Sequence, residues 1–252
     1  QPLLNKRYSR GKISKWFFIR YDDHAPHIRL RLQVAPEAIS EVLIAFKAKL
    51  EDRIQQHVIR EYQIDVYSRE LERYAGAGIE KTEGFFWASS ELVLSFIKQN
   101  KYKMAGTAHH FALYSTLAII KDFIPDLNEQ LQFTLASYQA FLPEFTGLQV
   151  KVELDKKYRE LTSGILATLK AEDPSLISGS IRAGRNFYKT LIAVQESIPR
   201  NDEERIPYLR SIVHMHLNRI FTDESRKQEM VTYYLLYKYL LSVKGRNIKG
   251  GG

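Results

Sequence analysis

Three short segments of the chain hold the side chains that could do chemistry, and the first is the alternating run His27-Ile28-Arg29-Leu30-Arg31-Leu32-Gln33-Val34. Period-two geometry in a β-strand places His27, Arg29 and Arg31 on one face and the aliphatic residues on the other. Two guanidiniums about 6.5 Å apart repel each other unless an anion lies between them. The pattern is more often an exposed strand face neutralised by nearby carboxylates. The functional alternative is a clamp for a carboxylate or phosphate group.

The second segment is Tyr67-Ser68-Arg69-Glu70-Leu71-Glu72-Arg73-Tyr74-Ala75-Gly76. Glu70 and Arg73 are three residues apart, so they face each other if the segment turns helically. By itself this spacing is typical of a surface salt bridge at the end of a strand.

The third segment is a predicted helix that contains His214 and His216. His-x-His resembles a metal-binding pair, but residues two apart on a helix point about 200° apart. One zinc ion therefore cannot bind both, and no other ligand cluster accompanies them. The adjacent pair His109-His110 meets the same objection, so the sequence predicts no metal site.

The two histidines of this helix have different neighbours. His216 shares a stripe with Ile212, Val213 and Ile220, which predicts a histidine packed in the core. The neighbours of His214 form a more polar face that suits a titrating group: Arg210, Ser211, Leu217 and Asn218. For His214 a structural role and a functional role are about equally expected.

Taken together, the three segments resemble one family. Phe17-Phe18-Ile19-Arg20-Tyr21 with His27-Ile28-Arg29-Leu30-Arg31, then Glu70-x-x-Arg73-Tyr74, then His214-Met215-His216-Leu217-Asn218-Arg219 resemble the elimination domain of class I lantibiotic (lanthipeptide) dehydratases. That domain also occurs as a stand-alone thiopeptide-type bacteriocin biosynthesis protein. The resemblance runs from about Lys15 to Val243, in the family's motif order. One departure is Ala75, where the family usually has glycine.

The resemblance implies a lyase. In this family a partner glutamylates Ser or Thr of a precursor peptide with glutamyl-tRNA, and the elimination domain expels glutamate to leave dehydroalanine or dehydrobutyrine. The partners implied here are a precursor (leader–core) peptide and a separate glutamylating dehydratase component. No metal, nucleotide or redox cofactor is required. The residues implied to be catalytic are Arg29, Arg31, Glu70, Arg73 and His214, while His27 and Asn218 are assigned to substrate binding.

These residue types suit a β-elimination. The reaction needs a base at Cα, stabilisation of the enolate-like charge and a stabilised carboxylate leaving group. Arginine holds carboxylates bidentately, and a neutral imidazole can take or return a proton near neutral pH. Glu70 could orient Arg73 or meet the ammonium of the glutamyl group. The base could be His214 or another group.

Two alternatives stay open. The first is a pyridine-forming cycloaddition enzyme of thiopeptide maturation, which shares the fold but departs from the elimination residues. The second is a non-catalytic module that binds a leader peptide or nucleic acid, because the formal net charge is +8. Basic residues gather near both ends of the chain, at Lys6, Arg7, Arg10, Lys12 and Lys15 and at Lys238, Lys244, Arg246 and Lys249.

The elements that must position these residues follow two rhythms, which predict an α+β fold with a small mixed or antiparallel sheet packed with a larger helical layer. Residues 15–75 are β-rich, with strands at 16–21, 27–34 and 58–67. A helix follows Pro36 and buries Ile39, Val42, Leu43, Phe46 and Leu50. Residues 82–243 are helical, in segments 85–97, 108–123, 127–141, 154–170, 185–198, 203–221 and 224–243.

Composition sets the remaining expectations. The chain has 252 residues, 44% hydrophobic and 26% charged, which suits one large folded domain or two small ones and excludes disorder. The resemblance implies one elimination-type domain over residues 1–252. It has no cysteine, which excludes disulfides and thiolate chemistry and fits a cytoplasmic protein. No apolar run approaches the roughly 20 residues of a membrane span. The oligomeric state is open, with a homodimer as one option.

Overall fold

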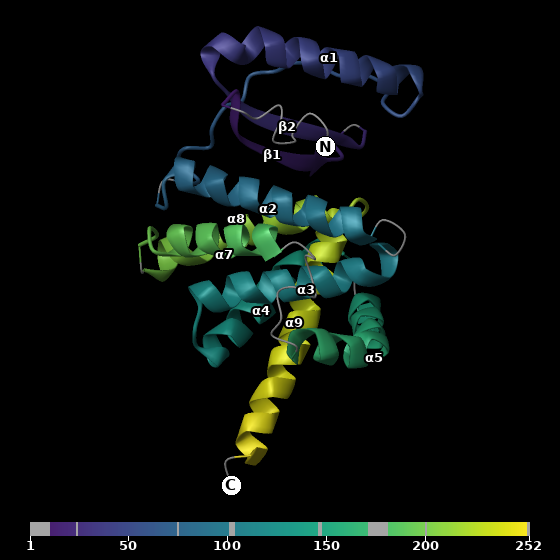
Figure 1. The fold of residues 1–252 in the computed structure, drawn as a ribbon. Coiled ribbons are helices and arrows are strands. Elements are labelled where there is room, and N and C mark those ends of the chain that lie inside the picture. Colours follow the sequence, from purple (N-terminus) through teal and green to yellow (C-terminus); the bar gives the residue numbers. More distant parts are fainter. Residues whose placement is uncertain are drawn as a thin grey trace. The chain divides into compact units, whose positions relative to one another are not determined.

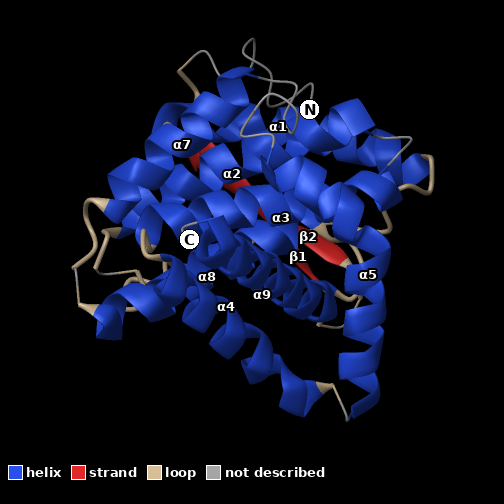
Figure 2. Ribbon diagram, turned by 90° about the horizontal axis from the view of Figure 1, so that it is seen from below, coloured by secondary structure: helices blue, strands red, loops and turns tan. Residues whose placement is uncertain are grey.

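The computed structural model describes residues 11–23, 25–74, 76–100, 104–145, 148–170, 181–199 and 201–250. Its contacts divide the chain into two compact units, unit 1 (residues 1–70) and unit 2 (residues 71–252). The organisation of residues 1–252 as one elimination-type domain stays a prediction. The α+β class is confirmed, because the strands lie in unit 1 and helices make up most of unit 2 (Figure 1 and Figure 2).

Unit 1 is built on an antiparallel strand pair, β1 (Ile13–Tyr21) and β2 (His27–Val34). The register places Ile19 opposite Arg29 and Phe17 opposite Arg31. Aromatic and β-branched residues favour β1, and its central side chains are buried. Both strands were predicted from the sequence and are confirmed.

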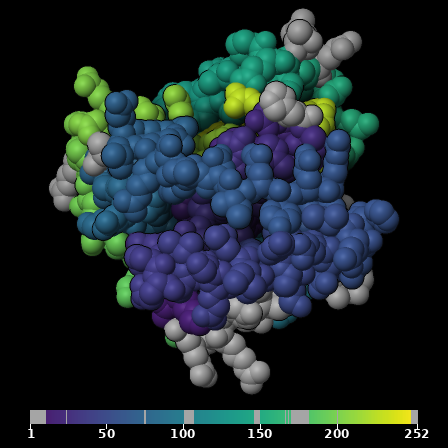
Figure 3. All heavy atoms as spheres, turned by 90° about the horizontal axis from the view of Figure 1, so that it is seen from above, coloured from purple at the N-terminus to yellow at the C-terminus, as the bar shows by residue number. Residues whose placement is uncertain are grey.

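A short 3-10 turn, η1 (Pro36–Ala38), leads into α1 (Ile39–Gln55), as the position of Pro36 predicts. The predicted buried stripe of α1 is wrong in part. Val42 is buried, but Ile39 and Leu43 are exposed. A two-stranded sheet offers too little surface to cover a full helical stripe. The indigo surface of α1 is visible in Figure 3.

The predicted third strand at 58–67 is absent from the structure of unit 1. Its apolar side chains Val58, Ile64 and Val66 are exposed. Alternating β-branched residues favour a strand only where a neighbouring edge supplies hydrogen bonds. Among the described residues of unit 1, β1 pairs only with β2, so the strand propensity of this segment is not matched by a hydrogen-bonding partner.

Unit 2 begins with α2 (Ile79–Asn100), α3 (Met104–Phe123) and α4 (Leu127–Phe141), followed by the 3-10 turn η2 (Leu142–Glu144). The later helices are α5 (Leu148–Lys170), α7 (Ile181–Gln195), α8 (Asp202–Ile220) and α9 (Ser225–Gly250). All seven predicted helical segments are confirmed. Helix α2 packs on α7, α4 packs on α9, and α8 packs on both α2 and α3. Within the described residues, no helix combines the length and the apolarity that a membrane crossing needs.

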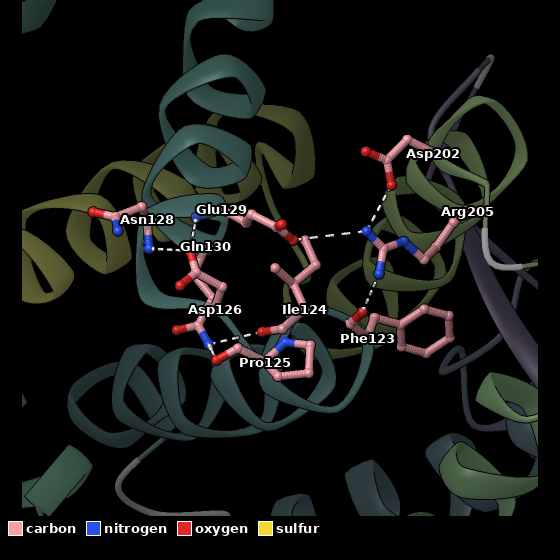
Figure 4. A network of polar contacts seen from close by, with 9 residues as sticks. All are labelled: Phe123, Ile124, Pro125, Asp126, Asn128, Glu129, Gln130, Asp202 and Arg205. Carbon is pink, nitrogen blue, oxygen red and sulfur yellow. Dashed lines mark hydrogen bonds and ion pairs between the residues drawn. The ribbon is translucent and has the colours of Figure 1, made fainter.

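Polar contacts at the start of α4 and α8 fix both helices (Figure 4). The Asp126 side chain accepts hydrogen bonds from the backbone N–H groups of Asn128 and Glu129 at 2.8 and 2.9 Å, which caps α4. Arg205, in the second turn of α8, donates to the Phe123 carbonyl and to Asp202 at 3.0 and 2.6 Å. This guanidinium therefore ties the end of α3 to the start of α8.

Candidate functional site

In unit 1, Arg29 is held by a set of neighbours on the β1–β2 turn. Its Nε donates to His27 Nε2 at 3.1 Å, and a terminal nitrogen donates to Asp23 Oδ2 at 3.1 Å. The guanidinium lies 3.8 Å from the centroid of the Tyr21 ring, at cation–π distance. Arg29 is thus partly neutralised, as the structural interpretation of the strand face predicts, and its orientation is fixed.

His27 takes part in the same arrangement. Its Nδ1 donates to the Ala25 carbonyl at 2.9 Å, so Nε2 is free to accept from Arg29. Its ring also stacks on Tyr21, with centroids 5.5 Å apart. His27 therefore supports Arg29, and its role in substrate binding stays a prediction.

Arg31 is held differently. Its guanidinium lies 5.0 Å from the Tyr67 ring centroid, and Tyr67 meets Phe17 edge-on at 5.8 Å. The buried Nε of Arg31 has no hydrogen-bond partner among the described residues. A buried donor without an acceptor is costly, and a carboxylate is the group that a guanidinium binds best.

Glu70 is the last residue of unit 1, and Arg73 lies near the start of unit 2. Both side chains are exposed. Next to Arg73, the buried Tyr74 anchors this turn in unit 2, because its hydroxyl hydrogen-bonds Ser211 Oγ of α8 at 3.0 Å. The predicted departure at Ala75 lies outside the described residues. Gly78 adopts φ +81, a left-handed conformation that glycine accepts readily, and α2 starts directly after it.

Helix α8 carries His214 on its one accessible stripe, between the exposed Arg210 and the half-buried Asn218. The His214 side chain keeps 34% of its surface exposed. Its Nδ1 lies 2.7 Å from Oε2 of Glu229, a buried carboxylate on α9. Of the face predicted to be polar, His214 and Asn218 are partly accessible, whereas Ser211 and Leu217 are buried.

On the opposite side of α8, the buried side chains of His216 and Arg219 make polar contacts with α2 and α3, which are called the α8 lock below. His216 is fully buried between Ser89 Oγ of α2 and Ser115 Oγ of α3, each at 2.8 Å. Burial, followed by the nearby Arg219 charge, lowers the pKa of His216 to about 3. Its predicted place in the core is confirmed.

Arg219 adds to this lock. Its Nε donates to Ser90 Oγ at 3.1 Å, another donor meets the Met215 carbonyl, and the guanidinium lies 5.0 Å from the Phe86 ring centroid. Burial lowers the pKa of Arg219 to about 9. Contacts to two neighbouring helices therefore fix the rotation of α8 and with it the direction of His214.

The two adjacent histidines of α3, His109 and His110, contact neighbouring helices. His109 Nε2 hydrogen-bonds Gln228 Oε1 at 2.9 Å, and burial is the main cause that lowers its pKa. His110 lies against Gly164 of α5. In the described part of the chain, no group of three or more His, Cys, Asp or Glu side chains could hold a metal ion.

The basic clusters near the two ends are partly neutralised. Lys12 pairs with Glu41, and Lys238 pairs with Asp155 at 3.1 Å. Lys6, Arg7 and Arg10 lie outside the described residues.

The structure thus brings the predicted residues into two sets. Arg29 and Arg31, with His27, share β2 of unit 1, while His214 and Asn218 share α8 of unit 2, to which Tyr74 anchors the turn of Arg73. That the two sets act on one substrate stays a prediction. Glu229 was missed by the sequence reasoning. The sequence feature that could have identified it is its spacing of four and seven residues from Tyr233 and Leu236, which places a carboxylate on the apolar stripe of a helix, where carboxylates are rare.

Comparisons with known proteins agree along most of the chain. A family model for the C-terminal part of lantibiotic biosynthesis dehydratases matches residues 1–240. The subtilin biosynthesis protein SpaB of Bacillus subtilis is 26% identical over 227 residues, which cover 86% of this chain and 21% of SpaB. The chain therefore spans about a fifth of the length of that relative.

Two solved structures share the fold. The tRNA-dependent lantibiotic dehydratase MibB from Microbispora sp. 107891 superposes with a TM-score of 0.68 and 18% identity, over 93% of this chain and 25% of MibB. The crystal structure of TsrL superposes with a TM-score of 0.61 and 13% identity, over 96% of this chain and 89% of TsrL. At these identities the likeness concerns the fold alone.

Proposed function

Because the chain belongs to the family of C-terminal regions of lantibiotic biosynthesis dehydratases, we propose that it is a glutamate-eliminating lyase. Its substrate is a precursor peptide with a glutamyl ester on Ser or Thr, and its peptide product carries dehydroalanine or dehydrobutyrine. In this reaction the Cα–H bond breaks and a base takes the proton. The electron pair forms the Cα=Cβ bond, the Cβ–O bond breaks, and glutamate leaves as a carboxylate.

The observation that carries this proposal is the state of the two arginines on β2. Arg29 is oriented by Asp23, His27 and the Tyr21 ring, while the buried Nε of Arg31 has no acceptor among the described residues. An anion that reaches the Arg31 guanidinium would supply the acceptor that its Nε lacks among the described residues, in a charge-assisted hydrogen bond. The glutamyl carboxylate and the departing glutamate have that chemistry. Contacts that strengthen as the leaving group gains charge lower the barrier.

His214 supports the same proposal from unit 2. It is a partly exposed imidazole on a helix whose rotation is fixed by buried contacts, and an imidazole exchanges protons near neutral pH. Arg73 adds a further cation for the carboxylates of the substrate, and Glu70 either orients Arg73 or meets the glutamyl ammonium.

The proposal also implies partners. A separate component must supply the glutamyl ester from glutamyl-tRNA, and the peptide must be presented to the site in its leader–core form. We place this chemistry in the cytoplasm, where aminoacyl-tRNA is made.

The test uses a synthetic leader–core peptide that carries one glutamyl-serine ester. We expect the full chain to convert it into the dehydroalanine peptide plus free glutamate, followed by mass spectrometry. In Arg31→Ala and His214→Ala the glutamylated peptide should persist while the circular dichroism spectrum is unchanged. Arg60→Ala, which removes an exposed arginine from the same unit, is the matched control and should turn over normally.

Other outcomes identify the alternatives. Persistence of the ester with the wild-type chain would contradict the lyase proposal. Ring closure and leader release from a peptide with two dehydroalanines would indicate a cycloaddition enzyme. Tight, steeply salt-dependent tRNA binding with no turnover would indicate a binding module.

A further inference from the structure

The contact between His214 and Glu229 joins an accessible imidazole to a buried carboxylate. Glu229 lies on α9 with 5% of its surface exposed, and its Oε2 is 2.7 Å from His214 Nδ1 on α8. Two titratable groups on its own helix also interact with Glu229, namely Arg226, which is hydrogen-bonded to Glu144, and the buried Tyr233.

A carboxylate in this position is expensive for folding. Burial of a carboxylate requires hydrogen-bonding partners, and apolar side chains would serve packing better at this face of α9. The partner of Glu229, His214, lies on the partly exposed stripe of α8 and keeps 34% of its side-chain surface exposed. This combination is typical of a pair in which a carboxylate orients a reactive histidine.

We propose that Glu229 is a positioning residue that holds His214 in the tautomer with the proton on Nδ1. An ionised carboxylate only accepts hydrogen bonds, so Nδ1 must donate. Nε2 then carries the lone pair, on a side chain that keeps 34% of its surface exposed. The inference rests on the proposed elimination, in which Nε2 takes the proton from Cα and Glu229 stabilises the resulting imidazolium.

The pair also explains why the α8 lock matters. Two coordinates of the imidazole have to be set, the rotation of the helix and the rotation of the ring. His216 and Arg219 fix the first through Ser89, Ser115 and Ser90. Glu229 fixes the second.

The first test is independent of turnover. In the full chain with ¹⁵N-labelled histidine, long-range proton–nitrogen correlation spectra report which nitrogen of His214 is protonated. We expect the Nδ1–H tautomer in the wild type and in Asp155→Asn, which removes another carboxylate that contacts α9. In Glu229→Gln the two tautomers should mix, because an amide can donate or accept. A predominant Nε2–H signal in the neutral wild-type imidazole would overturn the inference.

The second test measures elimination of the glutamyl-serine ester peptide. We expect kcat to fall about 10²-fold in Glu229→Gln, the size of a general acid–base contribution, with KM nearly unchanged. Glu229→Asp, which keeps the carboxylate, should recover part of kcat. Equal kcat in the wild type and Glu229→Gln would overturn the inference. Wild-type turnover with the Nε2–H tautomer would refute the positioning role of Glu229 but support the lyase. An Nδ1–H tautomer without turnover would refute the lyase and leave the pairing.

Discussion

The buried imidazole of His216 determines how the free energy of unfolding of this chain should respond to pH. Its pKa is about 3 in the folded protein, whereas the ordinary pKa of an exposed histidine is 6.5. Between these two values the unfolded chain binds a proton that the folded chain does not bind. The stability that His216 contributes is therefore fully present above pH 6.5 and is lost as the pH falls toward 3.

The size of the effect follows from linkage. The full difference corresponds to about 5 kcal/mol at very low pH. Between pH 7.5 and pH 5 the loss assigned to His216 is about 2 kcal/mol. His109, whose pKa burial also lowers, acts in the same direction and adds to the wild-type slope.

Urea unfolding at pH 7.5 and pH 5, followed by circular dichroism, measures this difference. The substitution His216→Gln keeps hydrogen-bonding groups toward Ser89 and Ser115 but cannot titrate. The substitution should lower the free energy of unfolding at pH 7.5. Between pH 7.5 and pH 5 the variant should lose about 2 kcal/mol less of this free energy than the wild type. His57→Asn, which removes an exposed histidine at a left-handed φ of 55 that Asn tolerates, should keep the wild-type slope. An identical change in the free energy of unfolding between the two pH values in the wild type and in His216→Gln would refute the reasoning.

Two further predictions concern helix ends and helix contacts. Asp126→Ala removes the cap of α4 and should lower the free energy of unfolding by about 1 kcal/mol, whereas Asp126→Asn should keep most of it; equal losses in urea melts would contradict the capping role. Gly164→Ala places a methyl group against the His110 ring and should cost about 1–3 kcal/mol. In a His110→Ala background the same change should be neutral or stabilising, since alanine favours a helix, and a persistent loss there would exclude the steric explanation.

The sequence predicted the helices of unit 2 well because their boundaries are local. Asp126 and Asn201 are capping residues in the sequence and cap α4 and α8 in the structure. The separate roles of His214 and His216 were also readable, because helical spacing decides which of them shares a stripe with Ile212 and Val213. No long-range information is needed for that distinction.

Unit 1 shows where local patterns fail. The segment 58–67 alternates like a strand, yet no strand in the described part of unit 1 pairs with it. On α1, Ile39 and Leu43 stay exposed. Strand formation and burial depend on what lies alongside, which a single sequence does not record. The contact of Glu229 with His214 was missed for the same reason, since it joins two helices across a 15-residue separation.

The polar groups packed around α8 have a common physical consequence. Apolar side chains would stabilise this core at lower cost than a neutral histidine and an arginine, because buried polar groups must each find partners. Hydrogen bonds, however, are directional, and His216 and Arg219 engage specific serines on α2 and α3. An apolar core tolerates small rotations of a helix, whereas this network does not. His214 lies on the accessible side of the same helix, so a rotation of α8 would separate its Nδ1 from Glu229. Protonation of His216 at low pH would therefore weaken the same contacts that fix the orientation of His214, the residue to which the proposed chemistry assigns the proton transfer.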